Sequence, residues 1–186
     1  MRTYQQPAKA VNQWHIGSES AFSDDQAAYI SSDNGISSGF QLSEISRAYM
    51  EIPVDLTYCL DPKLFFQWKT DTTVLYGHGE LLIMGMDQTL TIKPFTRSEG
   101  WQEYSISLNQ FKGEKIILRY AWMNDSVKHH HKEPAFCIDD IKIFSPVSPL
   151  PVNESPIITH IPDLTTMSGD NFLYTITTFD STNDAL

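Results

Sequence analysis

Short stretches in which apolar and polar residues alternate recur along the first 144 positions, and turn-forming residues separate them. In residues 115–122, the side chains of Ile116, Leu118, Tyr120 and Trp122 fall at every second position. Alternation with a period of two predicts an antiparallel strand with one buried face. No stretch shows a sustained period of 3.6 residues, the sign of an amphipathic helix. Strands are predicted at residues 27–31, 47–52, 64–69, 80–86, 90–92, 102–108, 115–122 and 135–144.

This number of strands at this spacing predicts an all-β fold built from two packed antiparallel sheets. Eight strands in one open sheet would leave long exposed edges, whereas two sheets bury one face each. The expected architecture is a jelly-roll sandwich. Gly77-His78-Gly79 is interpreted as a turn between two of the strands, and Asp33-Asn34-Gly35 as a turn that uses positive φ.

Five of the ten prolines fall between Pro146 and Pro162, which divides the chain. A proline-rich segment forms neither a helix nor a central strand, so residues 145–156 are predicted to be an extended linker. The sandwich is expected at residues 11–144, and residues 157–186 follow the linker. About 30 residues cannot bury an immunoglobulin-like core, which needs about 100. We therefore expect the chain to end inside a second repeat of a longer protein.

Composition and charge narrow the classes of partner. The 186 residues are 41% hydrophobic and 12% aromatic, which argues against a disordered chain. Aspartate and glutamate number 23 against 13 lysines and arginines, a net charge of -10. Nucleic acid is not expected as a partner, because phosphate contacts need clustered basic residues. No apolar run approaches the roughly 20 residues of a membrane-spanning helix, so no membrane insertion is expected.

Three groups of motifs carry a family resemblance. They are Trp14-His-Ile-Gly17 followed by Ala28-Tyr-Ile-Ser-Ser-Asp-Asn-Gly35; Leu64-Phe-Phe-Gln-Trp-Lys69; and Leu118-Arg-Tyr-Ala-Trp-Met-Asn-Asp125 with Ala135-Phe-Cys-Ile-Asp-Asp-Ile-Lys-Ile143. In this order they resemble the choice-of-anchor J domains of bacterial surface proteins, relatives of cleaved-adhesin and MAM-type jelly rolls. The segment 156–186 similarly resembles the opening of a cadherin-like or immunoglobulin-like bacterial repeat. The resemblance implies a galactose-binding-like jelly-roll sandwich in an extracellular or cell-surface module used for adhesion or as an accessory domain.

The resemblance also implies a candidate calcium site. In related jelly rolls, the first aspartate of the last strand, here Asp139, resembles a calcium ligand near the sheet edge. Calcium takes six to eight oxygen ligands, and Asp24 and Asp25 in a short acidic loop are the potential partners. A structural Ca²⁺ at Asp139, Asp24 and Asp25 is one interpretation. Hydrogen bonds that tie the last strand to a turn are the other, since a buried carboxylate needs a partner.

No catalytic motif is present. The sequence has no G-x-S-x-G, H-E-x-x-H, P-loop or G-x-G-x-x-G pattern, so a non-catalytic protein is expected. His129, His130 and His131 are interpreted as part of a solvated loop, because consecutive histidines rarely present more than two nitrogens to one metal. Whether Cys59 and Cys137 form a disulfide or remain two thiols stays open at this point.

Aromatic residues give the candidate ligand site. Trp68 and Trp122 share the apolar face of their strands and are predicted to lie in the core. Trp101, together with Tyr104 and Tyr76, is the better candidate for an exposed aromatic surface, because a flat indole stacks on the face of a sugar ring.

These observations predict a non-catalytic extracellular binding module of a bacterial cell-surface or secreted multidomain protein, whose ligand is a protein or a glycan on a cell surface or matrix. Two alternatives are a carbohydrate-binding module of a secreted hydrolase and an appendage of a secreted peptidase.

Overall fold

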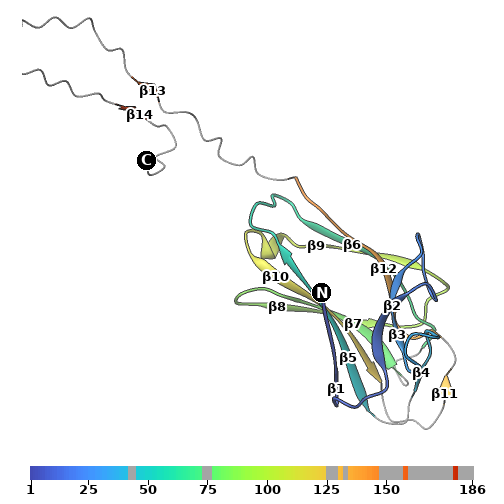
Figure 1. The fold of residues 1–186 in the computed structure, drawn as a ribbon. Coiled ribbons are helices and arrows are strands. Elements are labelled where there is room, and N and C mark those ends of the chain that lie inside the picture. The colour runs from blue at the N-terminus through green and yellow to red at the C-terminus, as the bar shows by residue number, and fades with distance from the viewer. Residues whose placement is uncertain are drawn as a thin grey trace, which may run out of the picture. The chain divides into compact units, whose positions relative to one another are not determined.

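The computed structural model describes residues 1–41, 45–72, 77–124, 130–131, 134–146, 157–158 and 178–179. Contacts within the chain divide it into two compact units, Met1–Ser148 and Pro149–Leu186. The first unit contains two five-stranded antiparallel sheets that lie as two layers (Figure 1). The structure therefore confirms the predicted all-β jelly-roll sandwich with two antiparallel sheets. No helix in the described ranges is long and apolar enough to cross a membrane.

The first sheet has the strand order β1-β5-β10-β7-β8, so β10 lies at its centre. Its long strands pair over most of their length, and every described pairing is antiparallel. The strands are β1 (Arg2–Gln6), β5 (Ser46–Asp55), β7 (Gly77–Met84), β8 (Thr89–Phe95) and β10 (Lys115–Asn124).

The second sheet has the order β2-β3-β12-β6-β9. Its strands are β2 (Gln13–Gly17), β3 (Ala27–Ser31), β6 (Lys63–Lys69), β9 (Gln102–Ser107) and β12 (Cys137–Phe144). Two short pairs complete the described elements: β4 (Phe40–Gln41) with β11 (His130–His131) in the first unit, and β13 (Ile157–Ile158) with β14 (Thr178–Phe179) in the second. A single 3₁₀ turn, η1 (Asn109–Phe111), precedes β10.

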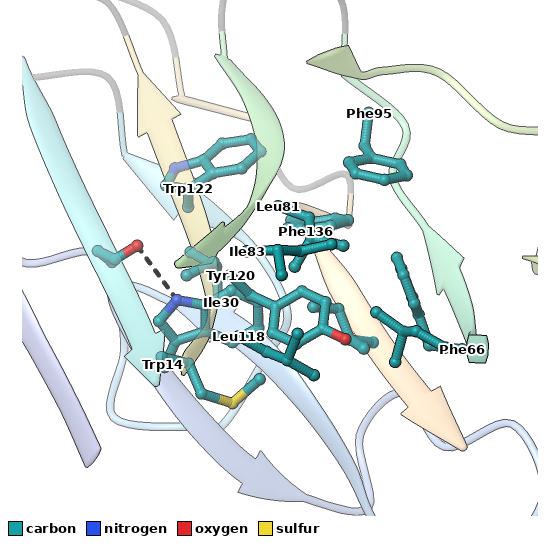
Figure 2. Close-up of a cluster of buried hydrophobic side chains, with 14 of the residues drawn as sticks. Trp14, Ile30, Phe66, Leu81, Ile83, Phe95, Leu118, Tyr120, Trp122 and Phe136 are labelled. Atoms are coloured by element: carbon teal, nitrogen blue, oxygen red, sulfur yellow. Dashed lines mark hydrogen bonds between the residues drawn. The ribbon is translucent and has the colours of Figure 1, made fainter. Parts of the chain in front are cut away.

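The core between the sheets consists of apolar side chains that the alternation of apolar and polar residues predicted to lie on the inner faces of the strands. Leu118, Tyr120 and Trp122 of β10 are all fully buried. Phe66 of β6 packs edge-on against Tyr120 across the two layers, with ring centroids 5.2 Å apart, and Figure 2 shows the Tyr120 hydroxyl pointing toward Phe66. The predicted core position of Trp122 is confirmed, whereas Trp68 is partly buried and packs against the core.

Trp14 illustrates how a polar atom is accommodated in this core. Its ring packs against Phe136 at 5.9 Å. Its indole N–H donates to the Ala48 carbonyl at 3.2 Å, the dashed line in Figure 2, and so links β2 of the second sheet to β5 of the first. A buried donor without a partner would cost about 1–3 kcal/mol, so this bond fixes the position at which the two sheets meet.

Gly77-His78-Gly79 was predicted to be a turn, and this prediction is wrong. The three residues begin β7 and pair with β10. A Cβ atom on Gly79 would lie 2.5 Å from the Phe136 ring, and one on Gly77 would lie 2.6 Å from the Trp122 ring. The glycines are therefore explained by the large rings beneath the strand and not by chain reversal.

Other local expectations have mixed outcomes. The turn at Asp33-Asn34-Gly35 is confirmed, since Asn34 and Gly35 have φ values of 61° and 86°. His130 and His131 were expected in a loop, but their backbones pair with β4. Cys59 and Cys137 are both free thiols. β1 lies before residue 11, so the sandwich extends beyond the start that the sequence suggested.

Candidate functional site

A pocket of about 230 Å³ opens at one end of the second sheet, where β6 ends and the chain approaches β9. Three segments that are distant in the sequence form it. We call it the Trp101 pocket because Trp101 directly follows the lining residue Gly100 in the chain. The lining residues are Lys69, Thr70, Asp71, Ser98, Gly100 and Pro134.

Hydrogen bonds between these segments hold the walls of the pocket together. The Ser98 amide donates to the Thr70 carbonyl at 2.8 Å, and the Thr70 amide donates to the Ser98 hydroxyl at 3.1 Å. The Asp71 amide donates to the Pro134 carbonyl at 3.0 Å. Because backbone groups of each segment are fixed by another segment, the pocket is preformed rather than assembled around a ligand.

Trp101 stands beside this pocket with a partly exposed ring. The ammonium of Lys69 lies 4.9 Å from the centroid of the indole, a cation–π contact. The ring of Phe22, from the loop between β2 and β3, lies 5.6 Å from the indole at an angle of 59°. Phe22 is itself 47% exposed. Two aromatic rings and a cation therefore meet at the rim of the pocket.

The lining offers both kinds of hydrogen-bonding group. Lys69 supplies donors, and the Asp71 carboxylate supplies acceptors. The Thr70 hydroxyl is buried and has no hydrogen-bond partner in the part of the chain that the structure describes. A buried polar atom without a partner is costly, so a polar ligand atom that reached Thr70 would relieve that cost.

The other two aromatic candidates from the sequence do not join Trp101. Tyr104 was expected to be exposed, but its ring packs against the core at 5.4 Å from Phe66 and 5.2 Å from Phe95. The reason is the register of β9, which turns Tyr104 inward with Ile106. Burial raises the pKa of the Tyr104 hydroxyl. Tyr76 lies outside the described residues.

Asp139 is buried at the junction of β12 and the loop between β2 and β3. Its Oδ2 accepts the Phe22 amide at 2.7 Å and the Ser23 amide at 3.4 Å, while its Oδ1 accepts the Asp140 amide at 2.6 Å. These bonds tie the last strand to a turn, which is one of the two interpretations that the sequence left open. They also fix Phe22, the ring that contacts Trp101.

The other two proposed calcium ligands, Asp24 and Asp25, do not share the hydrogen bonds of Asp139. Asp24 Oδ1 accepts the Gln26 amide at 3.0 Å, which closes a turn within the loop. Asp25 is exposed. Within the described ranges, no three histidine, cysteine, aspartate or glutamate side chains gather closely enough to hold a metal ion. The calcium site stays a prediction from the sequence.

The sequence pointed to Trp101 as a candidate but not to the residues that line the neighbouring pocket. Lys69 and Asp71 flank the end of a predicted strand, and Ser98 lies in a loop almost 30 positions later. Nothing in the local pattern links them, because the pairing of β6 with β9 brings them together. The only sequence signal for this pocket was that one predicted strand ends at Lys69 and another begins at Gln102.

No protein-family model and no curated protein matches the sequence. Solved structures resemble it at low identity. One is TmCBM61 in complex with β-1,4-galactotriose, with 14% identity, a TM-score of 0.49 and coverage of 78% of this chain and 88% of that chain. Another is the glycoside hydrolase domain of Endo-D from Streptococcus pneumoniae R6, with 9% identity, a TM-score of 0.47 and coverage of 85% and 24%. A third is a family 16 carbohydrate-binding module, with 8% identity, a TM-score of 0.41 and coverage of 71% and 85%. At these scores the likeness assigns no ligand to this chain, so the ligand has to be inferred from its own side chains.

Proposed function

We propose that this chain is a non-catalytic carbohydrate-binding module whose Trp101 pocket takes one sugar ring of a glycan. The observation that carries the proposal is the partly exposed Trp101 indole beside a preformed pocket of about 230 Å³ with charged and hydroxyl-bearing walls. A sugar ring has an apolar C–H face and a rim of hydroxyl groups. An indole next to donors and acceptors matches both.

The pocket residues divide the recognition between them. The indole of Trp101 covers the C–H face of the sugar, and the Asp71 carboxylate accepts hydrogen bonds from its hydroxyl groups. The Lys69 ammonium lies over the ring in the free protein and moves to a sugar oxygen when the ring is covered. An exposed cation–π contact is worth about 0.5–1 kcal/mol, which is small enough for a bound sugar to replace.

The same residues favour binding over glycoside hydrolysis. Hydrolysis uses two carboxyl groups on either side of the scissile bond, about 5 to 9.5 Å apart. Asp71 is the one carboxylate among the described residues that line the pocket. We therefore assign no reaction to the site.

The broader role follows from this proposal. A module that binds glycans would attach a secreted or cell-surface protein to a carbohydrate-coated surface, which joins the adhesion and the carbohydrate-binding interpretations of the sequence. Membership in the choice-of-anchor J family, and the extracellular location that it implies, stay predictions.

A glycan array followed by calorimetric titration of the bound sugar tests the proposal. Trp101→Ala should weaken binding by about 2 kcal/mol or more, near 30-fold, as expected for an aromatic anchor. Trp101→Phe should retain part of the affinity, because a flat ring remains. Asp71→Asn should weaken binding less than Trp101→Ala, since an amide still offers one acceptor.

The matched control is Tyr58→Ala, which removes an exposed ring from the loop that precedes β6, at the opposite end of that strand from Lys69. Its affinity should equal that of the unchanged protein. The proposal fails if no glycan on the array binds, or if Trp101→Ala binds the selected glycan as tightly as Tyr58→Ala.

A further inference from the structure

The outer face of the first sheet carries a second cluster of charged and aromatic side chains. Three of the four arginines of the chain lie on it, together with two tyrosines. The pairing registers of β1, β5 and β10 place them side by side. We call this set the arginine–tyrosine face; its residues are Arg2, Tyr4, Arg47, Tyr49, Glu51 and Arg119.

A polar network organises the centre of this face. Glu51 Oε1 receives Arg119 Nη2 at 2.6 Å, Arg119 Nε at 2.8 Å and the Tyr4 hydroxyl at 3.0 Å. All three contacts end on one carboxylate oxygen. Within the described residues Oε2 has no hydrogen-bond partner, so it can accept a hydrogen bond from a ligand. Burial raises the pKa of Glu51, but the hydrogen bonds from Arg119 and Tyr4 outweigh this and lower it overall. The carboxylate is therefore charged near neutral pH.

The aromatic rings are held by the same network. Tyr4 and Tyr49 stack with centroids 4.9 Å apart and an interplanar angle of 29°. The Arg119 guanidinium lies 5.5 Å from the Tyr49 centroid, and the Arg2 guanidinium lies 5.2 Å from the Tyr4 centroid. Packed rings and charged hydrogen bonds hold these side chains in place before any ligand arrives, which limits the entropy lost on binding.

The face continues into a recess of about 80 Å³ between the ends of β5, β7 and β10. Arg47, His78 and Met123 line it, and the buried polar residues Ser46 and Asn124 are also in its wall. A water occupies about 30 Å³ in the liquid, so the recess has room for a small substituent such as a carboxylate or a hydroxymethyl group.

The charge of this face departs from that of the whole chain, which is -10. The outward positions of β1, β5, β7 and β10 hold four cations and three carboxylates. Glu51 pairs with Arg119, and Asp55 pairs with Lys115 at 3.4 Å. Arg2 and Arg47 are exposed and have no ion pair in the described part of the chain. These two guanidinium groups are therefore available to an anionic ligand.

We infer that the arginine–tyrosine face binds a carboxylate-bearing polysaccharide, with Arg2 and Arg47 holding carboxylates of two sugar units. Arg2 lies opposite Glu51, and Arg47 lies four positions before Glu51 on β5, so they are about 13 Å apart along the strands. An extended chain laid along β5 reaches both. The Tyr4–Tyr49 pair lies between them, under the sugar rings.

The carboxylates beside the arginines favour a polysaccharide over an acidic peptide. Glu51 lies on the face and Glu80 pairs with His78 at 3.2 Å beside the recess. Glu51 and Glu80 repel the carboxylates of either ligand, but the side chains of an acidic peptide carry no donors that would offset this repulsion. A polyuronate supplies carboxylates for Arg2 and Arg47, and hydroxyl groups for the free oxygen of Glu51.

This surface belongs to the first sheet, whereas the Trp101 pocket lies at the end of the second. The inference therefore stands apart from the proposed function, and variants of one surface leave the other in place.

Calorimetric titration with a hexamer of galacturonic acid, and with its methyl ester as the uncharged counterpart, tests the inference. The acid should bind, and the ester should bind at least tenfold more weakly. Arg2→Gln with Arg47→Gln should lower the affinity for the acid about tenfold or more, because hydrogen bonds to charged groups are lost. Both side chains are exposed, and a melting curve of the double variant checks that it folds.

Lys115→Gln is the matched control, since it removes an exposed cation from the same face at its ion pair with Asp55. This substitution should leave the affinity for the acid unchanged. The inference is overturned if the acid does not bind, if the ester binds equally well, or if the arginine double variant binds like Lys115→Gln. Equal competition by poly-glutamate would also overturn it, in favour of a general anion surface. Neutral glycans that still bind at Trp101 in any of these cases would leave the proposed function intact.

Discussion

The Asp139 carboxylate accepts the backbone amides of Phe22, Ser23 and Asp140 at the base of the loop between β2 and β3. The loop in turn presents Phe22 to Trp101. One buried side chain thus joins the last strand to the rim of the candidate site. At the scale of single residues, such bonds decide whether a surface loop has one conformation or many.

Asp139→Ala should lower the free energy of unfolding by about 1–3 kcal/mol, because three partly buried amides lose the charged acceptor of their hydrogen bonds. Chemical denaturation of the two proteins measures this difference. Asp25→Ala, an exposed carboxylate in the same loop, should change stability by less than about 0.5 kcal/mol. Equal effects of the two substitutions would contradict the role given to Asp139.

The predicted calcium site has its own test. If Asp139, Asp24 and Asp25 hold Ca²⁺, the midpoint of thermal unfolding rises with calcium over chelator, since a ligand that binds the folded state stabilises it. The rise should disappear when Asp24 and Asp25 are both replaced by asparagine. Identical midpoints in calcium and in chelator would contradict the site.

Asp33 provides a prediction about pH. A hydrogen bond from Ser31, and then bonds from the Ser37 side chain and amide, lower the pKa of Asp33 from 3.8 to about 2. A carboxyl whose pKa is lower in the folded state stabilises the fold above the ordinary pKa and loses this effect as pH falls. The contribution of Asp33 should therefore vanish between pH 3.8 and about pH 2.

The stability of the unchanged protein should fall more steeply over that range than the stability of Asp33→Asn. Denaturation at several pH values checks this, and an NMR titration of the Asp33 carboxyl gives its pKa directly. Parallel curves for the two proteins would show that Asp33 does not contribute.

At the scale of elements, the alternation of apolar residues found the strands that carry the core. The eight predicted strands all correspond to observed ones, and 27–31 matches β3 in full. β1 and β2 were not predicted, because few of their side chains are buried. β1 is an edge strand, and its sequence Arg-Thr-Tyr-Gln-Gln has no buried residue. An edge strand is held by backbone pairing, which leaves little trace in the hydrophobic pattern.

Gly79 in β7 should tolerate no side chain. Gly79→Ala places a Cβ 2.5 Å from the Phe136 ring, and overpacking of this kind costs about 1–3 kcal/mol or more. Chemical denaturation measures the loss. Gly113→Ala is the control: Gly113 has a φ of 84° with open space around it, so the cost is conformational, about 1–2 kcal/mol. A smaller loss at Gly79 than at Gly113 would contradict the steric explanation.

At the scale of the whole molecule, every strand of the two five-stranded sheets lies within Met1–Ser148. The Trp101 pocket and the arginine–tyrosine face are formed within the same unit. Both surfaces therefore depend on one core. The two proposed binding surfaces lie on different sheets, so each can be tested without altering the other.

A chain of residues 1–148 should fold by itself and bind the same ligands as the longer chain. We expect its thermal midpoint to agree within a few degrees and its glycan affinity to be unchanged, because the strand pairings described in the first unit are all kept. Calorimetry and titration of the two chains test this. A large fall in the midpoint would show that the second unit stabilises the first.

The sequence by itself determined the fold class and the inner faces of the strands, because period-two alternation is a local consequence of the extended backbone. It also pointed to Trp101 as a candidate ligand-binding residue. Only the tertiary structure decided that Tyr104 faces the core and that the rings of Trp122 and Phe136 pack against Gly77 and Gly79. It also decided that Lys69, Asp71 and Ser98 share a pocket. The physical reason is that these features depend on strand register and on contacts between distant segments. The same holds for the arginine–tyrosine face, where pairing of β1, β5 and β10 brings together arginines from positions 2, 47 and 119.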